Sequence, residues 1–138
     1  MATIEQIKSA LRDYHLCITG VKTAPERLRK IETADLPCVM VRTGQGDWGH
    51  DNSGQMRQER QFFIECLVEP LTQMLPSEQE LLIDQMIDAF ADYYYANLEI
   101  APGCWININS ITDTGIQVMD FGTRYIGFVF EFTVQIRR

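Results

Sequence analysis

The chain has 138 residues, of which 46% are apolar and 22% charged, so its length and composition are those of one globular domain. Its 19 acidic residues outnumber the 12 basic ones and give a formal charge of -7, which repels nucleic acid and makes a DNA-reading module unexpected. Because no stretch approaches the roughly 20 apolar residues of a membrane span and residues 1–13 lack a secretory core, we expect a cytosolic chain without membrane partners.

The first third of the chain predicts a helix and then a strand. Thr3 is placed to cap a short amphipathic helix that continues to about Tyr14. The segment after it is irregular, with one turn of helix expected at residues 26–30 behind a proline. Residues 36–42 are typical of a strand, because Pro37 stands at its start, where the missing N–H donor does least harm.

Residues 44–54 combine four glycines with small polar residues, which predicts a mobile loop. A second long strand is expected at about residues 57–68, so the two strands and the loop form a long hairpin. The glycines match Gly-x-Gly-x-x-Gly, but the next element is a strand, whereas a dinucleotide phosphate needs a helix N-terminus there. Asp47 within the motif would also repel a phosphate, so we expect no cofactor.

A second helix is predicted from the capping box of Ser77 and Glu80 to about Asn97. Its apolar side chains fall on one broad face that should cover a sheet. This face consists of Leu82, Ile83, Met86, Ile87, Ala89, Phe90 and Tyr94. Asp84, Asp88 and Asp92 recur every four residues on another side, which we interpret as the solvated face of the helix.

Three more strands are expected at residues 105–111, 116–120 and 125–136. In the last one every second residue is apolar, which predicts one buried face and one mostly polar face. The apolar residues are Ile126, Phe128, Phe130, Phe132, Val134 and Ile136. The elements together predict an α+β fold: a single domain over residues 1–138 with a mixed, mostly antiparallel sheet, a long hairpin and two main helices packed against it.

No residue pattern is typical of a catalytic or metal centre. The four cysteines are widely separated and form no Cys-x-x-Cys pair, so we expect reduced, mostly buried thiols. The two histidines, His15 and His50, stand in no recognisable triad or nucleophile context. His50 beside Asp47 and Asp51 lacks the preorganised geometry of a metal site. We therefore predict no catalytic residue, no metal and no enzyme activity.

The hairpin is the best candidate for contact with a partner or with other copies of the chain. Trp48 stands among glycines, where it either covers a partner surface or folds back onto its own sheet. The start of the second strand is polar on both faces and should project beyond the core, either as a subunit contact or as an edge protected by charges. The candidate contacts are Asp47, Trp48, His50, Asp51, Arg57, Glu59 and Arg60.

The chain resembles the tail terminator proteins of long-tailed, lambda-type bacteriophages over nearly its whole length. The resemblance rests on the N-terminal helix, Leu36-Pro37 before the first strand, the Gly-rich hairpin, the capped second helix and the final strand. That strand has the pattern Tyr125-x-Gly127-x-Val129-x-Glu131-x-Thr133. It is a resemblance of pattern, since no single signature motif defines the family.

The resemblance implies a structural protein of the virion that acts at the head-proximal end of the tail. Six copies would form a homo-hexameric ring that stops growth of the tail tube and offers a docking face to the head. The implied partners are further copies of the chain, the tail tube protein and the head-tail connector or neck proteins. DNA would pass through the lumen without specific binding, and assembly would take place in the host cytoplasm. The family pattern includes no catalytic residue or cofactor.

Two other functions remain open from the sequence. A head-completion or neck protein of similar size belongs to the same structural class. A small α+β ligand-binding or enzyme domain belongs to another class and would use a pocket between the second helix and the sheet. Sealing of that interface by Phe90 and Tyr94 would leave no room for such a pocket.

Overall fold

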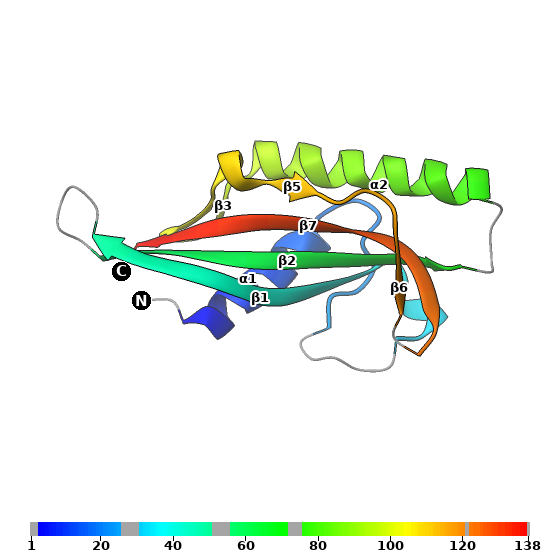
Figure 1. Cartoon of the computed structure of the whole chain (residues 1–138), viewed down its shortest axis with the longest axis horizontal. Helices are drawn as coiled ribbons and strands as arrows, with labels where there is room; N and C mark the ends of the chain where they lie inside the picture. The colour runs from blue at the N-terminus through cyan, green and yellow to red at the C-terminus, as the bar shows by residue number, and fades with distance from the viewer. Residues whose placement is uncertain (1–2, 26–30, 51–55, 72–75, 121, 138) are drawn as a thin grey trace.

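The computed structural model describes residues 3–25, 31–50, 56–71, 76–120 and 122–137, in which a large sheet is combined with two α-helices (Figure 1). The elements in chain order are α1 (Ile4–Leu16), the 3-10 turn η1 (Thr33–Asp35), β1 (Cys38–His50), β2 (Met56–Pro70), α2 (Pro76–Ala96), β3 (Glu99–Ala101), β4 (Cys104–Ile106), the 3-10 turn η2 (Ile108–Ser110), β5 (Thr112–Asp113), β6 (Gln117–Asp120) and β7 (Arg124–Arg137). The predicted α+β fold is confirmed.

Strand β7 is the centre of the sheet. The strand order is β1-β2-β7-β4-β3, and every one of these neighbours is antiparallel. Strand β2 pairs with β7 along one edge, while β4, β5 and β6 pair in succession with the other edge. Only the isolated bridge between Thr23 and Cys38 is parallel among the described pairings. The hairpin of β1 and β2 therefore extends outward from the central strand.

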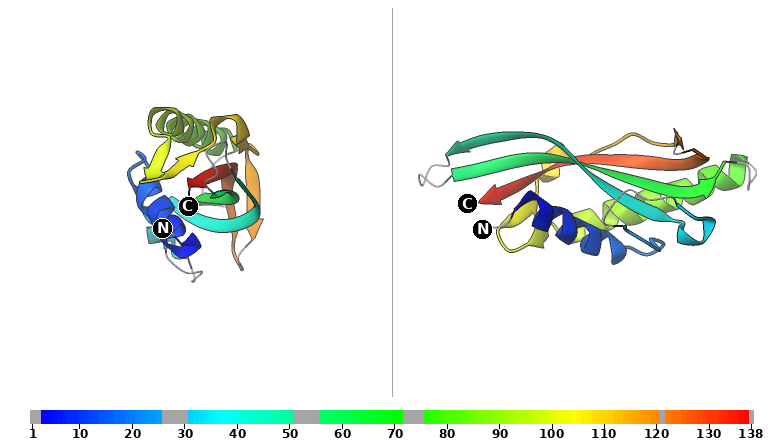
Figure 2. Two further views of the ribbon diagram at one scale, coloured as in Figure 1. Left: turned by 90° about the vertical axis from the view of Figure 1, so that its left-hand side faces the viewer. Right: turned by 90° about the horizontal axis from the view of Figure 1, so that it is seen from below.

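Both α-helices cover the same face of the sheet (Figure 2). The alternating apolar residues of β7 point to this face and are buried, as their period of two predicts. Phe90 of α2 contacts Phe128 and Phe130, with ring centroids 5.0 and 5.8 Å apart. Tyr94, one helical turn later, contacts Phe130 and Phe132. Aromatic side chains thus fill the space between α2 and the sheet.

A buried histidine joins α1 to α2. His15 is fully buried; its Nδ1 lies 2.6 Å from the Leu11 carbonyl oxygen and its Nε2 lies 2.7 Å from the Tyr94 hydroxyl. Because a carbonyl oxygen only accepts, Nδ1 carries the proton and Tyr94 donates to Nε2. Burial lowers the pKa of His15 to about 4, so the ring is neutral at neutral pH.

The opposite face of the sheet is covered by no α-helix in the described part of the chain (Figure 2). At one end of this face a second apolar cluster closes it, made of Ile31, Leu36, Cys38, Met40, Leu67, Met119 and Tyr125. The Tyr125 hydroxyl donates to the Ile31 carbonyl oxygen at 3.1 Å and ties the segment before η1 to β7. Along the rest of the face, side chains such as Phe63, Glu131 and Thr133 are half-buried. We call this surface the open face.

The prediction of a loop at residues 44–54 is wrong for residues 44–50, which belong to a strand. Strand β1 continues to His50 and pairs with β2 down to Met56, with a register shift between Thr43 and Gly46. The glycines make room for side chains of β2: a Cβ on Gly44 would lie 2.8 Å from the Phe63 ring. A Cβ on Gly46 would lie 2.5 Å from the Arg60 guanidinium carbon. Residues 51–54 of the predicted loop lie outside the described residues.

Several predicted boundaries are wrong, each for a local reason. Helix α2 begins at Pro76, so Ser77 lies in its first turn and is not its cap. Instead, the buried Gln79 donates from Nε2 to the Leu71 carbonyl oxygen at 3.2 Å and ties the helix to the end of β2. The strand predicted at residues 105–111 ends at Ile106, where η2 replaces it. The helical turn predicted at residues 26–30 lies outside the described residues.

None of the helices in the described part of the chain combines the length and the apolar composition that a membrane span requires.

Candidate partner-binding surfaces

Six of the seven predicted contact residues lie together at one end of the sheet, on β1 and β2. The end of this hairpin extends past the start of α1 and the end of β7 (Figures 1 and 2). The register places Asp47 opposite Glu59, Trp48 opposite Gln58, and His50 opposite Met56. Asp51 lies outside the described residues. We call residues 46–50, 56–60 and 134–137 the hairpin end.

The charged residues of the hairpin end lie on both faces of the sheet. Asp47, Glu59 and Arg57 point to the open face, because strand residues alternate and their neighbour Phe63 lies on that face. Arg57 Nη2 lies 3.9 Å from Glu59 Oε1, and both side chains are partly exposed. Arg57 is also opposite Arg137 of β7. These exposed charges add little to stability and are available to orient a partner.

Arg60 belongs to the other face and is held against its own strand pair. Its side chain lies over Gly46, and its Nη1 donates to the Gly44 carbonyl oxygen at 3.3 Å. The Gly44–Gly46 register shift and the long Arg60 side chain therefore form one structural unit. Arg60 therefore has a structural task inside its own chain.

Trp48 is the most exposed large aromatic residue of the hairpin end, with 54% of its surface accessible. Its pairing with the fully buried Gln58 puts it on the helix-covered side of the sheet, near the end of β1. This end of the strand extends past the start of α1 (Figure 2). Together with Asp47, Arg57 and Glu59 it lines a small depression of about 90 Å³. Trp48 is half exposed and half covered by its own chain, so its contact with a partner stays a prediction.

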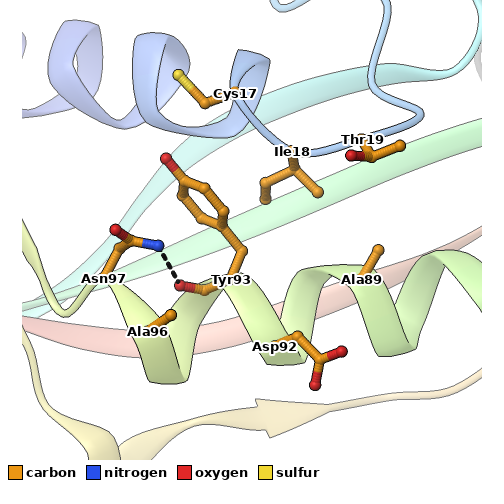
Figure 3. Close-up of a pocket in the computed structure, with 8 residues that line it drawn as sticks. All are labelled: Cys17, Ile18, Thr19, Ala89, Asp92, Tyr93, Ala96 and Asn97. Carbon is orange, nitrogen blue, oxygen red and sulfur yellow. Dashed lines mark hydrogen bonds between the residues drawn. The ribbon is translucent and has the colours of Figure 1, made fainter.

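A second surface, which the sequence did not predict, follows the flank of α2. Two adjoining depressions of about 340 and 410 Å³ lie between α2 and the turn after α1, and they share Thr19 and Ala89. Figure 3 shows Ile18 and Tyr93 pointing into the first depression, whereas the Asp92 carboxylate points away from the α1 side. We call the two depressions the α2 groove. They are lined by Cys17, Ile18, Thr19, Gly20, Pro37, Glu69, Leu82, Gln85, Met86, Ala89, Asp92, Tyr93, Ala96 and Asn97.

The wall of the groove near α1 is formed by Cys17 and the turn after it. Tyr14 of α1 donates to the carbonyl oxygen of Asn97 at the end of α2 and joins the two walls. Asn97 Nδ2 donates to the Tyr93 carbonyl oxygen at 3.2 Å within the α2 wall (Figure 3). Partial burial, followed by a hydrogen bond with the Cys17 thiol, raises the pKa of Tyr93. The sequence gives only a weak indication of this groove. Ala89 and Ala96 are small residues beside the apolar face of α2, where they leave room for a depression.

The outer side of α2 is strongly acidic. Its acidic residues are Glu78, Glu80, Asp84, Asp88 and Asp92, all exposed, and the helix contains neither Lys nor Arg. The solvated face predicted for Asp84, Asp88 and Asp92 is confirmed. Leu81 and Tyr95 are 60% and 63% exposed on the same helix. The combination of exposed apolar groups and one sign of charge makes α2 a second candidate for partner contact.

The cysteines are free thiols, as expected, and three of the four are buried. Cys17 is the exposed one, and it lines the α2 groove. Among the described residues, no group of three or more His, Cys, Asp or Glu side chains is arranged to hold a metal ion. His15 and Cys17 do not form a catalytic pair, because the His15 ring is used entirely by Leu11 and Tyr94.

No protein-family model matches the chain, and no curated protein matches it in sequence.

Proposed function

We propose that this chain is a phage tail terminator: a structural protein that forms a homo-hexameric ring, caps the head-proximal end of the tail tube and provides the face to which the head docks. The resemblance of its sequence pattern to that family suggested this function. The order of helix, long hairpin, helix and antiparallel strands agrees with the pattern on which the resemblance rests. In this proposal the protein acts in the virion, after assembly in the host cytoplasm.

The observation that carries the proposal is the projecting hairpin end. A strand pair that extends past its own helices adds little to the core, so its length is explained best by a surface that it contacts. Trp48 and Arg57 are residue types that are enriched at interfaces. A ring of identical subunits on a tube needs such a surface for the next subunit or for the tube.

The space that a ligand-binding function would need is filled. Phe90 and Tyr94 are fully buried against the sheet, and the depressions next to α2 lie at its flank. This arrangement favours an assembly protein over a small ligand-binding or enzyme domain that uses a pocket beneath α2. A neck protein of the same size would share the projecting hairpin, and the experiment below separates these two functions.

The proposal is tested by letting tail tube protein polymerise with and without this chain and measuring tube lengths by electron microscopy. A terminator shortens the tubes and narrows their length distribution in proportion to its concentration. A neck protein binds completed tails without changing their growth. Unchanged tube lengths, with no chain bound to tube ends, would contradict the proposed function.

A further inference from the structure

We propose that the α2 groove receives the hairpin end of a second copy of this chain, so that Trp48 of one copy enters the groove beside Cys17 of the next. This inference rests on the proposed function and adds to it the contact that closes the ring. Both surfaces are defined by described residues, and they lie on different parts of the molecule (Figures 1 and 3).

The symmetry of a ring requires two different surfaces. A two-fold contact joins the same patch on both copies and ends at a dimer, whereas a ring of more than two copies joins one patch to another. In this chain the hairpin end extends from one end of the sheet, while α2 lies along the other half (Figure 1). One copy therefore does not fill its own groove, and the next copy supplies the hairpin in a head-to-tail contact.

The charges favour this pairing over a symmetric one. Two copies joined through α2 would bring five carboxylates against five, with no basic residue on either helix. The hairpin end has arginines, Arg57 and Arg137 among them, beside Asp47 and Glu59, so it offers both signs of charge, whereas the outer side of α2 offers carboxylates alone. The acidic outer side of α2 can therefore pair with an arginine from the hairpin end of another copy and repels another α2.

The apolar groups of the two surfaces are also complementary. Trp48 presents a half-exposed indole, and the groove presents Ile18, Ala89 and Met86 between its walls. Each depression has a volume of a few hundred Å³, which suits one large aromatic side chain. Insertion of the indole would remove apolar surface from water on both copies, as happens at the central residues of most interfaces.

Cys17 provides a native probe of the groove. It is exposed on the groove wall, while Cys38, Cys66 and Cys104 are buried. A thiol-alkylating reagent applied to the folded protein therefore reports on the groove alone. We expect the labelling rate of Cys17 in rings, formed in solution or on tail tubes, to be lower than in the dissociated chain by a factor of about ten or more.

Variants then test which surface covers Cys17. Trp48→Ala should abolish both ring formation and the protection of Cys17. Val118→Ala on β6, which removes an apolar side chain that is 55% exposed and belongs to neither surface, should leave both unchanged. Asp92→Arg should also prevent rings. An equal mixture of Trp48→Ala and Asp92→Arg chains should give dimers without rings, because each pair has one intact hairpin and one intact groove.

The outcomes separate this inference from the proposed function. Rings in which Cys17 is labelled at the rate of the free chain would overturn the inference and leave the terminator function intact. Rings formed normally by the Trp48→Ala chain, or by the mixture, would overturn it as well. If the wild-type chain forms no ring in solution or on tubes, the proposed function fails, and this inference fails with it. The labelling of the wild-type chain needs no variant, so a misfolded variant does not weaken the test.

Discussion

At the scale of single residues, His15 fixes the two α-helices to each other, and Gly127 lies where β7 packs tightly against β2. His15 has its ring between a backbone carbonyl of α1 and the Tyr94 hydroxyl of α2, in a fully buried position. Gly127 has no room for a side chain, because a Cβ there would clash with the Cys66 carbonyl oxygen of β2. Each makes a prediction about stability that is independent of the assembly.

The stability of the fold should fall as the pH drops from 6.5 to 4. The pKa of His15 is lowered from 6.5 to about 4 by burial, so in this range the unfolded chain binds a proton that the folded chain excludes. The contribution is complete above pH 6.5 and declines toward pH 4, with a total loss of about 3 kcal/mol. Urea unfolding at a series of pH values measures it. The His15→Gln variant should lose this part of the pH dependence; an identical profile for both proteins would show that His15 is not responsible.

Gly127→Ala should destabilise the protein strongly. The added Cβ meets backbone atoms of Cys66, which cannot move without breaking the pairing of β2 and β7. We expect a loss of about 3 kcal/mol or more in the free energy of unfolding, at the upper end of overpacking effects. Gly46→Ala is the matched control, because its Cβ meets the end of the Arg60 side chain, which can swing aside at the cost of its hydrogen bond to the Gly44 carbonyl oxygen. Equal losses for the two variants, measured by urea unfolding, would contradict this reasoning.

At the scale of secondary-structure elements, the alternation of apolar residues along β7 predicts which of its side chains are buried. Phe130 is 2% exposed and contacts both Phe90 and Tyr94, so Phe130→Ala should cost about 3 to 5 kcal/mol. Gln135, further along the same strand, lies on the open face, and Gln135→Ala should change stability by less than about 0.5 kcal/mol. Thermal and urea unfolding of both variants measure the difference. A stable Phe130→Ala protein would mean that the opposite face of β7 is inside.

The same elements show what sequence patterns predict and where they fail. Long amphipathic segments such as β2, α2 and β7 follow their hydrophobic period, because one face of each is buried by a large partner. The glycines of β1 are an exception, because a glycine that admits a neighbouring side chain, as Gly46 admits Arg60, looks in sequence like one that makes a turn. The pairing of three short strands with one edge of β7 depends on tertiary contacts, so no local signal predicts it.

The candidate site was predicted in part for the same reason. The charged, projecting start of β2 is a local pattern, and the predicted contacts Asp47, Trp48, Arg57 and Glu59 meet there because β1 and β2 pair directly. The α2 groove joins residues about 70 positions apart in the chain, such as Cys17 and Ala89. A short sequence pattern does not show which residues so far apart in the chain come into contact, so the groove is seen only in the folded structure.

At the scale of the whole molecule, the fold has the features that head-to-tail assembly needs. One end of the sheet projects with an exposed tryptophan, the flank of α2 is hollowed and acidic, and the core between them is filled with aromatic side chains. These features support the proposal that the protein acts through its contacts with other chains. A small domain with two such surfaces forms a closed ring when successive contacts rotate it back to its start.

The measurement that tests this account most directly is negative-stain electron microscopy of the purified chain, alone over a wide concentration range and mixed with tail tubes. The account predicts closed six-fold rings and tubes capped at one end only. Compact single particles at every concentration, with bare tube ends, would contradict it.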